Sequence, residues 1–116
     1  MTFVRFHKSF HYFQIQIDTF ILWLFSKKEL CGYDIIKEFE SRSKEAWKPS
    51  PALIYPKIML MASEGLIKET NKGSRGKKFY KITPKGDIKL NEKMGSLKED
   101  LLYYEDFLKE VFEVQE

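Results

Sequence analysis

KPSPALIYPKIMLMASEGLIKETNKGSRGKKFYKITP, residues 48–84, is the stretch that decides the fold of this chain. Ser50-Pro51 is a typical helix start, because serine caps free backbone N–H groups and proline is tolerated in the first turn. Apolar residues then recur at helical spacing, and Gly65 suits the position just past a helix end. Residues 66–70 and 78–83 have the pattern of strands. The stretch therefore predicts a helix followed by a two-stranded hairpin.

The tip of this hairpin is basic and contains two glycines, which permit a tight turn. A helix followed by such a hairpin is typical of a winged helix, in which the helix enters a DNA groove and the wing lies along the phosphates. A solvated hairpin tip, where lysines are common, is the alternative interpretation. The wing residues that we expect to contact DNA are Lys72, Arg75, Lys77 and Lys78.

Charge is unevenly distributed along the chain. Residues 1–83 carry 15 Lys/Arg and 8 Asp/Glu, a balance of +7, whereas residues 84–116 carry 5 and 9, a balance of −4. A basic body with an acidic C-terminal segment is typical of a polyanion-binding head joined to an element with another role. Chance fluctuation in composition is the alternative.

Composition and motifs argue against several classes of protein. The 116 residues, 43% of them hydrophobic, suit one globular domain. The single Cys31 excludes an internal disulfide, and we find no glycine-rich phosphate loop, metal-ligand set or nucleophile paired with a base. We therefore expect neither an enzyme nor a cofactor or metal site. The longest apolar run, residues 20–25, is far shorter than the roughly 20 residues of a membrane span, so we expect no membrane contact. Because we see neither a disulfide framework nor a signal peptide, we expect a cytoplasmic protein.

The first half of the chain predicts two helices before the stretch quoted above. Residues 1–12 form an N-terminal extension, either an amphipathic helix or a frayed segment held by its aromatic side chains. Residues 13–26 form a helix whose apolar stripe is broad enough for burial on two sides. The next helix starts near Gly32 and ends near residues 41–43, and a proline-containing turn links it to the helix after Ser50. Two helices joined in this way make a helix-turn-helix.

The predicted fold is thus mainly α with a small β-hairpin: a winged helix-turn-helix head over residues 13–83 and a long dimerisation helix over residues 84–116. Thr83 caps this last helix and Pro84 takes its first turn. About 30 helical residues span about 45 Å, more than a small head can cover, so the exposed part needs a partner. We expect a homodimer whose interface contains an apolar heptad seam and two residues of the first helix: Phe20, Leu24, Leu90, Met94, Leu97, Leu101, Tyr104, Leu108 and Val111.

Several short segments, in this order and spacing, resemble the PadR family of winged-helix transcriptional regulators. They are LCGYDI (30–35), WKPSP (47–51), LIYP (53–56), EGLI (64–67) and RGKKFYKITPKG (75–86). The similarity covers about residues 14–90, and the single C-terminal helix resembles the shorter branch of the family. The resemblance implies a homodimer that joins through its first and last helices. It also implies sequence-specific binding to a roughly palindromic operator on double-stranded DNA, usually as a repressor.

The helix after Ser50 corresponds to the recognition helix, the one that enters the DNA groove. It departs from the family pattern at Met59 and Leu60, where basic residues are common. Lys57 is then the only cation on this helix, which shifts the electrostatic contribution to the wing. Tyr55 is the first candidate for DNA contact, since its hydroxyl can donate to a phosphate; a half-buried core tyrosine is the alternative. The other candidates are Lys48, Ser50, Ala52, Ile54 and Lys57, of which Ala52 and Ile54 suit a thymine methyl if they face outward.

Two further predictions concern ligands and partners. Some family members bind aromatic small molecules between the dimer-forming helices, which implies a pocket lined by Trp23, Tyr103, Tyr104 and Phe107. Aromatic residues at helical spacing are also common in plain cores, which is the alternative. The alternative function is a winged-helix protein that acts through protein contacts at Met59 and Leu60, with only non-specific DNA binding.

Overall fold

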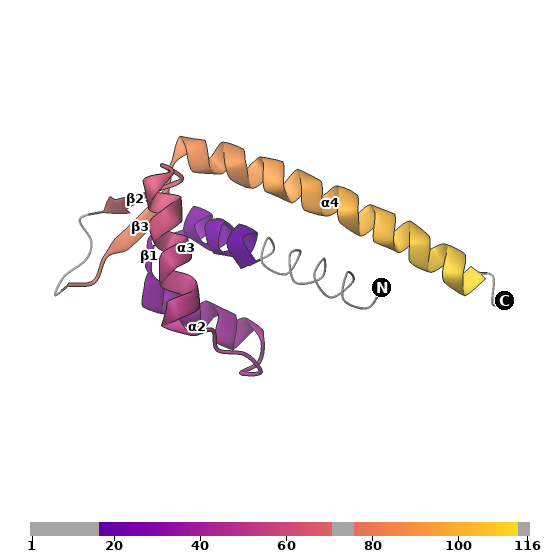
Figure 1. Ribbon diagram of the computed structural model, residues 1–116, viewed down its shortest axis with the longest axis horizontal. Helices are drawn as coiled ribbons and strands as arrows, with labels where there is room; N and C mark the ends of the chain where they lie inside the picture. The colour runs from indigo at the N-terminus through magenta and orange to yellow at the C-terminus, as the bar shows by residue number, and fades with distance from the viewer. Residues whose placement is uncertain (1–16, 71–75, 114–116) are drawn as a thin grey trace.

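The computed structural model describes residues 17–70 and 76–113 and shows a small helical head from which one long helix projects (Figure 1). Residues 17–27 are helical and are called the first helix below. The remaining elements follow in chain order: β1 (Leu30–Cys31), α2 (Gly32–Arg42), α3 (Pro51–Ser63), β2 (Ile67–Thr70), β3 (Phe79–Ile82) and α4 (Pro84–Glu113). The prediction of a mainly helical winged helix-turn-helix with a long C-terminal helix is confirmed. The predicted extension, residues 1–12, lies outside the described residues.

The three strands form one antiparallel sheet in the order β1-β3-β2. In the predicted hairpin, Ile67 lies opposite Ile82 and Thr70 opposite Phe79, and β1 adds a third strand by placing Leu30 opposite Tyr80. Each hairpin strand is shorter than predicted, because residue 66 precedes the ladder and Thr83 leaves it to cap α4.

Local side-chain chemistry fixes the ends of α3 and α4 as predicted. Ser50 Oγ accepts a hydrogen bond from Leu53 N–H at 3.3 Å at the start of α3. Gly65 follows α3 with a φ of +77°, the left-handed conformation that glycine adopts most easily. Thr83 Oγ1 accepts from Gly86 N–H at 3.0 Å and donates to the Gly65 carbonyl at 2.6 Å. The threonine thus ties the start of α4 to the end of α3.

The core of the head lies where the first helix, α2, α3 and the sheet meet. Its largest fully buried side chains are Phe25, Ile21, Leu22, Ile35, Ile54 and Ile58. Leu24 and Leu90 are also buried here, with 3% and 7% of their surfaces exposed. Their predicted role in the dimer interface is therefore wrong, because both side chains are already enclosed within one chain.

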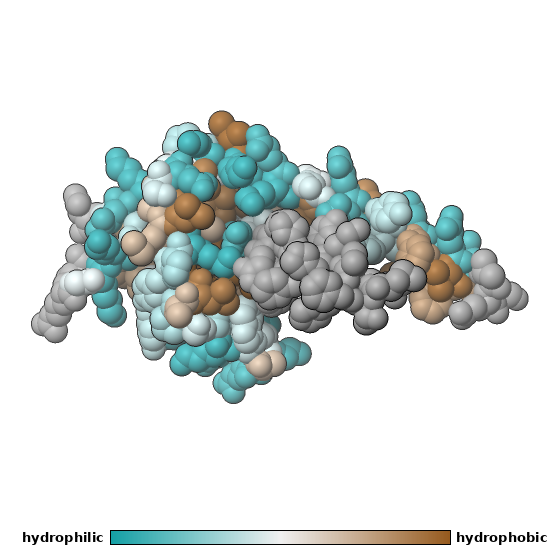
Figure 2. Space-filling view, viewed as in Figure 1, coloured by the Kyte–Doolittle hydropathy of each residue, from teal (hydrophilic) through white to brown (hydrophobic). Residues whose placement is uncertain are grey.

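Most of α4 lies outside this core. Beyond Gly86 and Leu90, which are buried in the head, the helix projects past the other described elements, at the opposite end of the molecule from β2 and β3 (Figure 1). Figure 2 shows apolar side chains gathered near its C-terminal end. The large apolar side chains exposed on this part are Met94, Leu101, Leu102, Tyr103, Tyr104, Phe107, Leu108, Val111 and Phe112. Within residues 17–70 and 76–113, no helix has both the length and the apolar character needed to cross a membrane.

Candidate nucleic-acid interface

Helix α3 packs one face into the head and turns the other outward. Ile54, Ile58 and Met61 point into the core, whereas Tyr55 and Met59 are 43% and 67% exposed. The predicted contact of Ile54 with a thymine methyl is wrong, because this side chain is completely buried. Ala52 does face outward, so its predicted contact remains a prediction.

Lys57 does not extend from the outward face of α3. Its side chain is only 17% exposed, and its Nζ lies 2.7 Å from Asp18 Oδ1 on the first helix. The ion pair draws the cation toward the body of the head. The single chain thus holds Lys57 in an ion pair with the first helix, and its contact with DNA stays a prediction.

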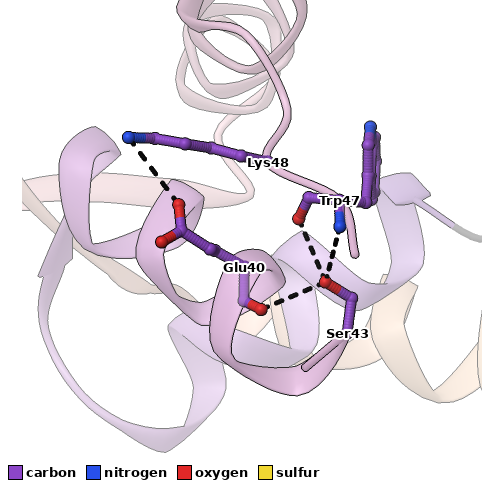
Figure 3. Close-up of polar contacts among 4 residues, drawn as sticks. All are labelled: Glu40, Ser43, Trp47 and Lys48. Atoms are coloured by element: carbon purple, nitrogen blue, oxygen red, sulfur yellow. Dashed lines mark hydrogen bonds and ion pairs between the residues drawn. The ribbon is translucent and has the colours of Figure 1, made fainter. Parts of the chain in front are cut away.

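The turn between α2 and α3 is held by a small set of polar contacts (Figure 3). Ser43 Oγ accepts from Trp47 N–H at 3.0 Å and lies 3.1 Å from the Glu40 carbonyl oxygen, to which it can donate. The Trp47 ring packs edge-on against Phe39, with 5.2 Å between centroids. Lys48, a predicted DNA contact, is largely exposed and its Nζ lies 3.7 Å from Glu40 Oε2. An exposed pair of this kind contributes little to stability, so Lys48 stays available for an anionic ligand.

A cleft of about 680 Å³ separates α3 from the wing. Tyr55 and Met59 line it from α3, and Lys77 and Lys78 line it from the segment that enters β3. The Tyr55 ring packs over Gly32 so closely that a Cβ at Gly32 would lie 2.5 Å from Tyr55 Cε1. The missing side chain of Gly32 thus leaves room for the hydroxyl end of the Tyr55 ring at the start of α2, where Tyr55 also lines the cleft.

Lys77 and Lys78, the two predicted wing contacts that the structure describes, are exposed where the cleft opens. Gly76 precedes them with a φ of +81°, and Tyr80 anchors β3 through an edge-on contact with Phe25 at 6.2 Å between ring centroids. The other two predicted wing contacts, Lys72 and Arg75, lie outside the described residues.

Tyr33 is a candidate that the sequence analysis missed. It is 53% exposed near the start of α2 and lines the same cleft. Lys37 Nζ lies 5.4 Å and Lys77 Nζ 6.0 Å from the centroid of its ring. The i, i+4 spacing of Tyr33 and Lys37 on one helix was the available signal, whereas the approach of Lys77 depends on how the wing packs. Two cations near an exposed tyrosine suit an anionic ligand such as a phosphate group.

A second, apolar hollow of about 430 Å³ lies between the first helix and α4. It is lined by Thr19, Phe20, Trp23, Met94, Leu97 and Leu101. Of the four residues predicted to share a ligand pocket, only Trp23 belongs to it. Tyr103, Tyr104 and Phe107 lie farther along α4 and are exposed in the single chain, so a pocket that they share with Trp23 between dimer-forming helices stays a prediction.

An exposed helix beside a lysine-bearing wing defines the class of the protein as a winged helix-turn-helix of the DNA-binding type. The chain belongs to the transcriptional regulator PadR-like family, whose model matches residues 21–92. This is a family of transcriptional regulators rather than enzymes.

Individual relatives agree with this assignment. The chain is 35% identical over 75 residues to the negative transcriptional regulator PadR of Bacillus subtilis (strain 168), a match that covers 62% of this chain and 41% of that protein. The chain thus spans about two fifths of the length of this curated relative. It is also similar to the structure of Bacillus subtilis PadR in complex with operator DNA, with a TM-score of 0.55, 31% identity and coverage of 66% of this chain and 45% of that chain. For a PadR-like transcriptional regulator from Bacillus cereus strain ATCC 14579, the TM-score is 0.69, the identity 28% and the coverage 79% and 90%.

Proposed function

We propose that this protein is a sequence-specific transcriptional repressor that binds a palindromic operator as a homodimer in the cytoplasm. The observation that carries the proposal is the shared cleft, which brings Tyr55 of the exposed helix and Lys77 and Lys78 of the wing onto one surface. In such an arrangement the helix contacts base edges and the wing contacts phosphates. The relatives named as a negative regulator and as an operator complex support repression at an operator.

Selection of bound duplexes from a random pool at physiological salt tests the DNA-binding part. We expect enrichment of two inverted half-sites, because a twofold dimer presents two identical recognition helices. Binding of all duplexes with equal affinity would refute the proposed function. It would favour the alternative in which the exposed Met59 and Leu60 contact a protein partner.

The homodimer is proposed from the exposed apolar face of α4. Leu101, Tyr104 and Leu108 recur there at heptad spacing and are about half or more exposed in the single chain. Leu108→Glu would place a charge in this face, whereas Glu99→Lys changes a charge about 180° around the helix from Leu90. We expect light scattering to show a dimer for the wild type and for Glu99→Lys, and a monomer for Leu108→Glu. A wild type that is monomeric at tens of micromolar would refute the dimer.

The proposed function also includes an aromatic small molecule that weakens operator binding. The apolar hollow beside Trp23 is of a size that small organic ligands occupy. The chain has two tryptophans, so Trp47→Phe leaves Trp23 as the only indole reporter. We expect planar aromatic compounds to quench its fluorescence and to weaken operator binding. A panel that leaves the fluorescence unchanged would argue against an effector at this position.

A further inference from the structure

The outward face of α3 is almost entirely apolar. All residues of this helix are described, and its exposed side chains are Pro51, Ala52, Tyr55, Pro56, Met59, Leu60 and Ser63. Met59 and Leu60 are 67% and 59% exposed, and Figure 2 shows apolar side chains over α3. Side chains of this size and exposure on a recognition helix are available to a ligand rather than to the core.

The polar side chains of α3 do not form the centre of its outward face. Lys57 is drawn to Asp18 by the 2.7 Å ion pair. The Ser63 hydroxyl donates to the Leu60 carbonyl at 2.8 Å. Tyr55 points its hydroxyl end toward Gly32 at the start of α2, and it lines the cleft together with Lys77. The centre of the outward face is therefore formed by the apolar surface of Ala52, Pro56 and Met59.

Base pairs display one apolar group in the major groove, the C5-methyl of thymine. We propose that α3 reads its operator through thymine methyl groups, with Met59 as the principal contact and Ala52 as a second. This proposal rests on the proposed function and names the DNA chemistry that the same helix recognises. An unbranched thioether suits the role, because it adapts to the uneven floor of a groove and buries apolar surface there.

The charge around Met59 favours DNA over a protein as the occupant of this face. Met59 shares its cleft with Lys77 and Lys78, and both lysines are exposed. A polyanionic ligand that meets the lysines brings its bases against the apolar face of α3. The wing would then supply affinity that depends on salt, and Met59 would supply sequence preference that does not.

Replacement of thymine by deoxyuridine in a selected operator removes the methyl and leaves base pairing intact. We expect half-sites rich in A·T pairs, and about fourfold weaker binding for each contacted thymine replaced, which corresponds to one buried carbon at about 0.8 kcal/mol. Fluorescence anisotropy at one fixed salt concentration measures this. Sequence-specific binding that is unaffected by deoxyuridine at every position would overturn this inference and leave the proposed function intact.

The Met59→Ala variant tests whether the Met59 side chain causes the preference for thymine over deoxyuridine. At a contacted position, we expect this variant to bind thymine and deoxyuridine DNA with equal affinity, whereas the wild type discriminates about fourfold. Ile88→Ala, which removes a 63% exposed apolar side chain from α4, is the matched control and should discriminate like the wild type. Full discrimination retained by Met59→Ala would overturn the assignment. A pool that yields no preferred sequence would instead refute the proposed function, together with this inference.

Discussion

Gly86→Ala tests the junction between the head and α4. Gly86 is buried, and a Cβ at this position would overlap the carbonyl oxygen of Leu66 and lie 2.6 Å from Ile82 Cγ1. The Leu66 carbonyl accepts from Thr83 N–H at 3.0 Å, so moving it also disturbs the cap of α4. The added methyl therefore meets backbone that cannot yield without loss of a hydrogen bond.

The expected change in the free energy of unfolding on Gly86→Ala is the sum of opposing contributions. Alanine favours the helix by about 1 kcal/mol over glycine. Overpacking against backbone costs about 3 kcal/mol, the upper end of the usual range, and the weakened hydrogen bond about 1 kcal/mol. The net loss is about 3 kcal/mol, which lowers the melting temperature by roughly 10–20 °C for a domain of this size.

Gly95→Ala is the matched control. Nothing lies within 4 Å of a Cβ at Gly95, and the residue is about 140° around α4 from Leu90, away from the apolar seam. Its substitution should raise stability by about 1 kcal/mol. Circular dichroism melts at one protein concentration measure both variants. A Gly86→Ala protein that melts at or above the wild-type temperature would refute the packing of α4 against Leu66.

Three further variants test single contacts. Lys78→Gln removes one wing cation from each subunit of the proposed dimer, so the slope of log affinity against log salt should shrink by about 1.8; an unchanged slope would show that Lys78 meets no phosphate. Asp18→Asn should lower the free energy of unfolding by about 1 kcal/mol, because it breaks the 2.7 Å ion pair with Lys57, and equal denaturant midpoints would contradict this. Ser43→Ala should lower it by about 1–2 kcal/mol and speed hydrogen exchange in residues 44–49; unchanged exchange would show that the hydroxyl does not hold the turn.

The sequence predicted those features that depend on neighbouring residues. The caps at Ser50 and Thr83 and the glycine after α3 follow from local backbone chemistry, and they are found where expected. The sequence also predicted a basic wing, because Lys77 and Lys78 are adjacent. Both side chains are exposed in the structure.

The features that the sequence did not predict depend on packing between distant segments. The burial of Ile54 is not one of them, because its i, i+4, i+7 spacing with Ile58 and Met61 already placed it on the core face of α3. Lys57 is a surface cation by composition, but the first helix brings Asp18 to it. Tyr33 joins the candidate site because the wing lies beside α2. Neither the approach of Asp18 to Lys57 nor the approach of the wing to Tyr33 has a signal in local spacing.

The heptad seam of α4 is continuous in sequence but serves different parts of the molecule. Leu90 is buried in the head, Met94 and Leu97 line the apolar hollow beside Trp23, and Leu108 is exposed farther along. The first turns of α4 are thus fixed to the same core that holds α3. In the proposed dimer, each recognition helix is therefore fixed to one end of α4, a rigid helix about 45 Å long. A rotation of about 5° where two such helices cross near their far ends moves the head by about 4 Å over this length, comparable with the rise of one base pair. Contacts along α4 that shift the crossing by this amount would move both copies of α3 out of register with their half-sites, without any change in the residues that touch DNA.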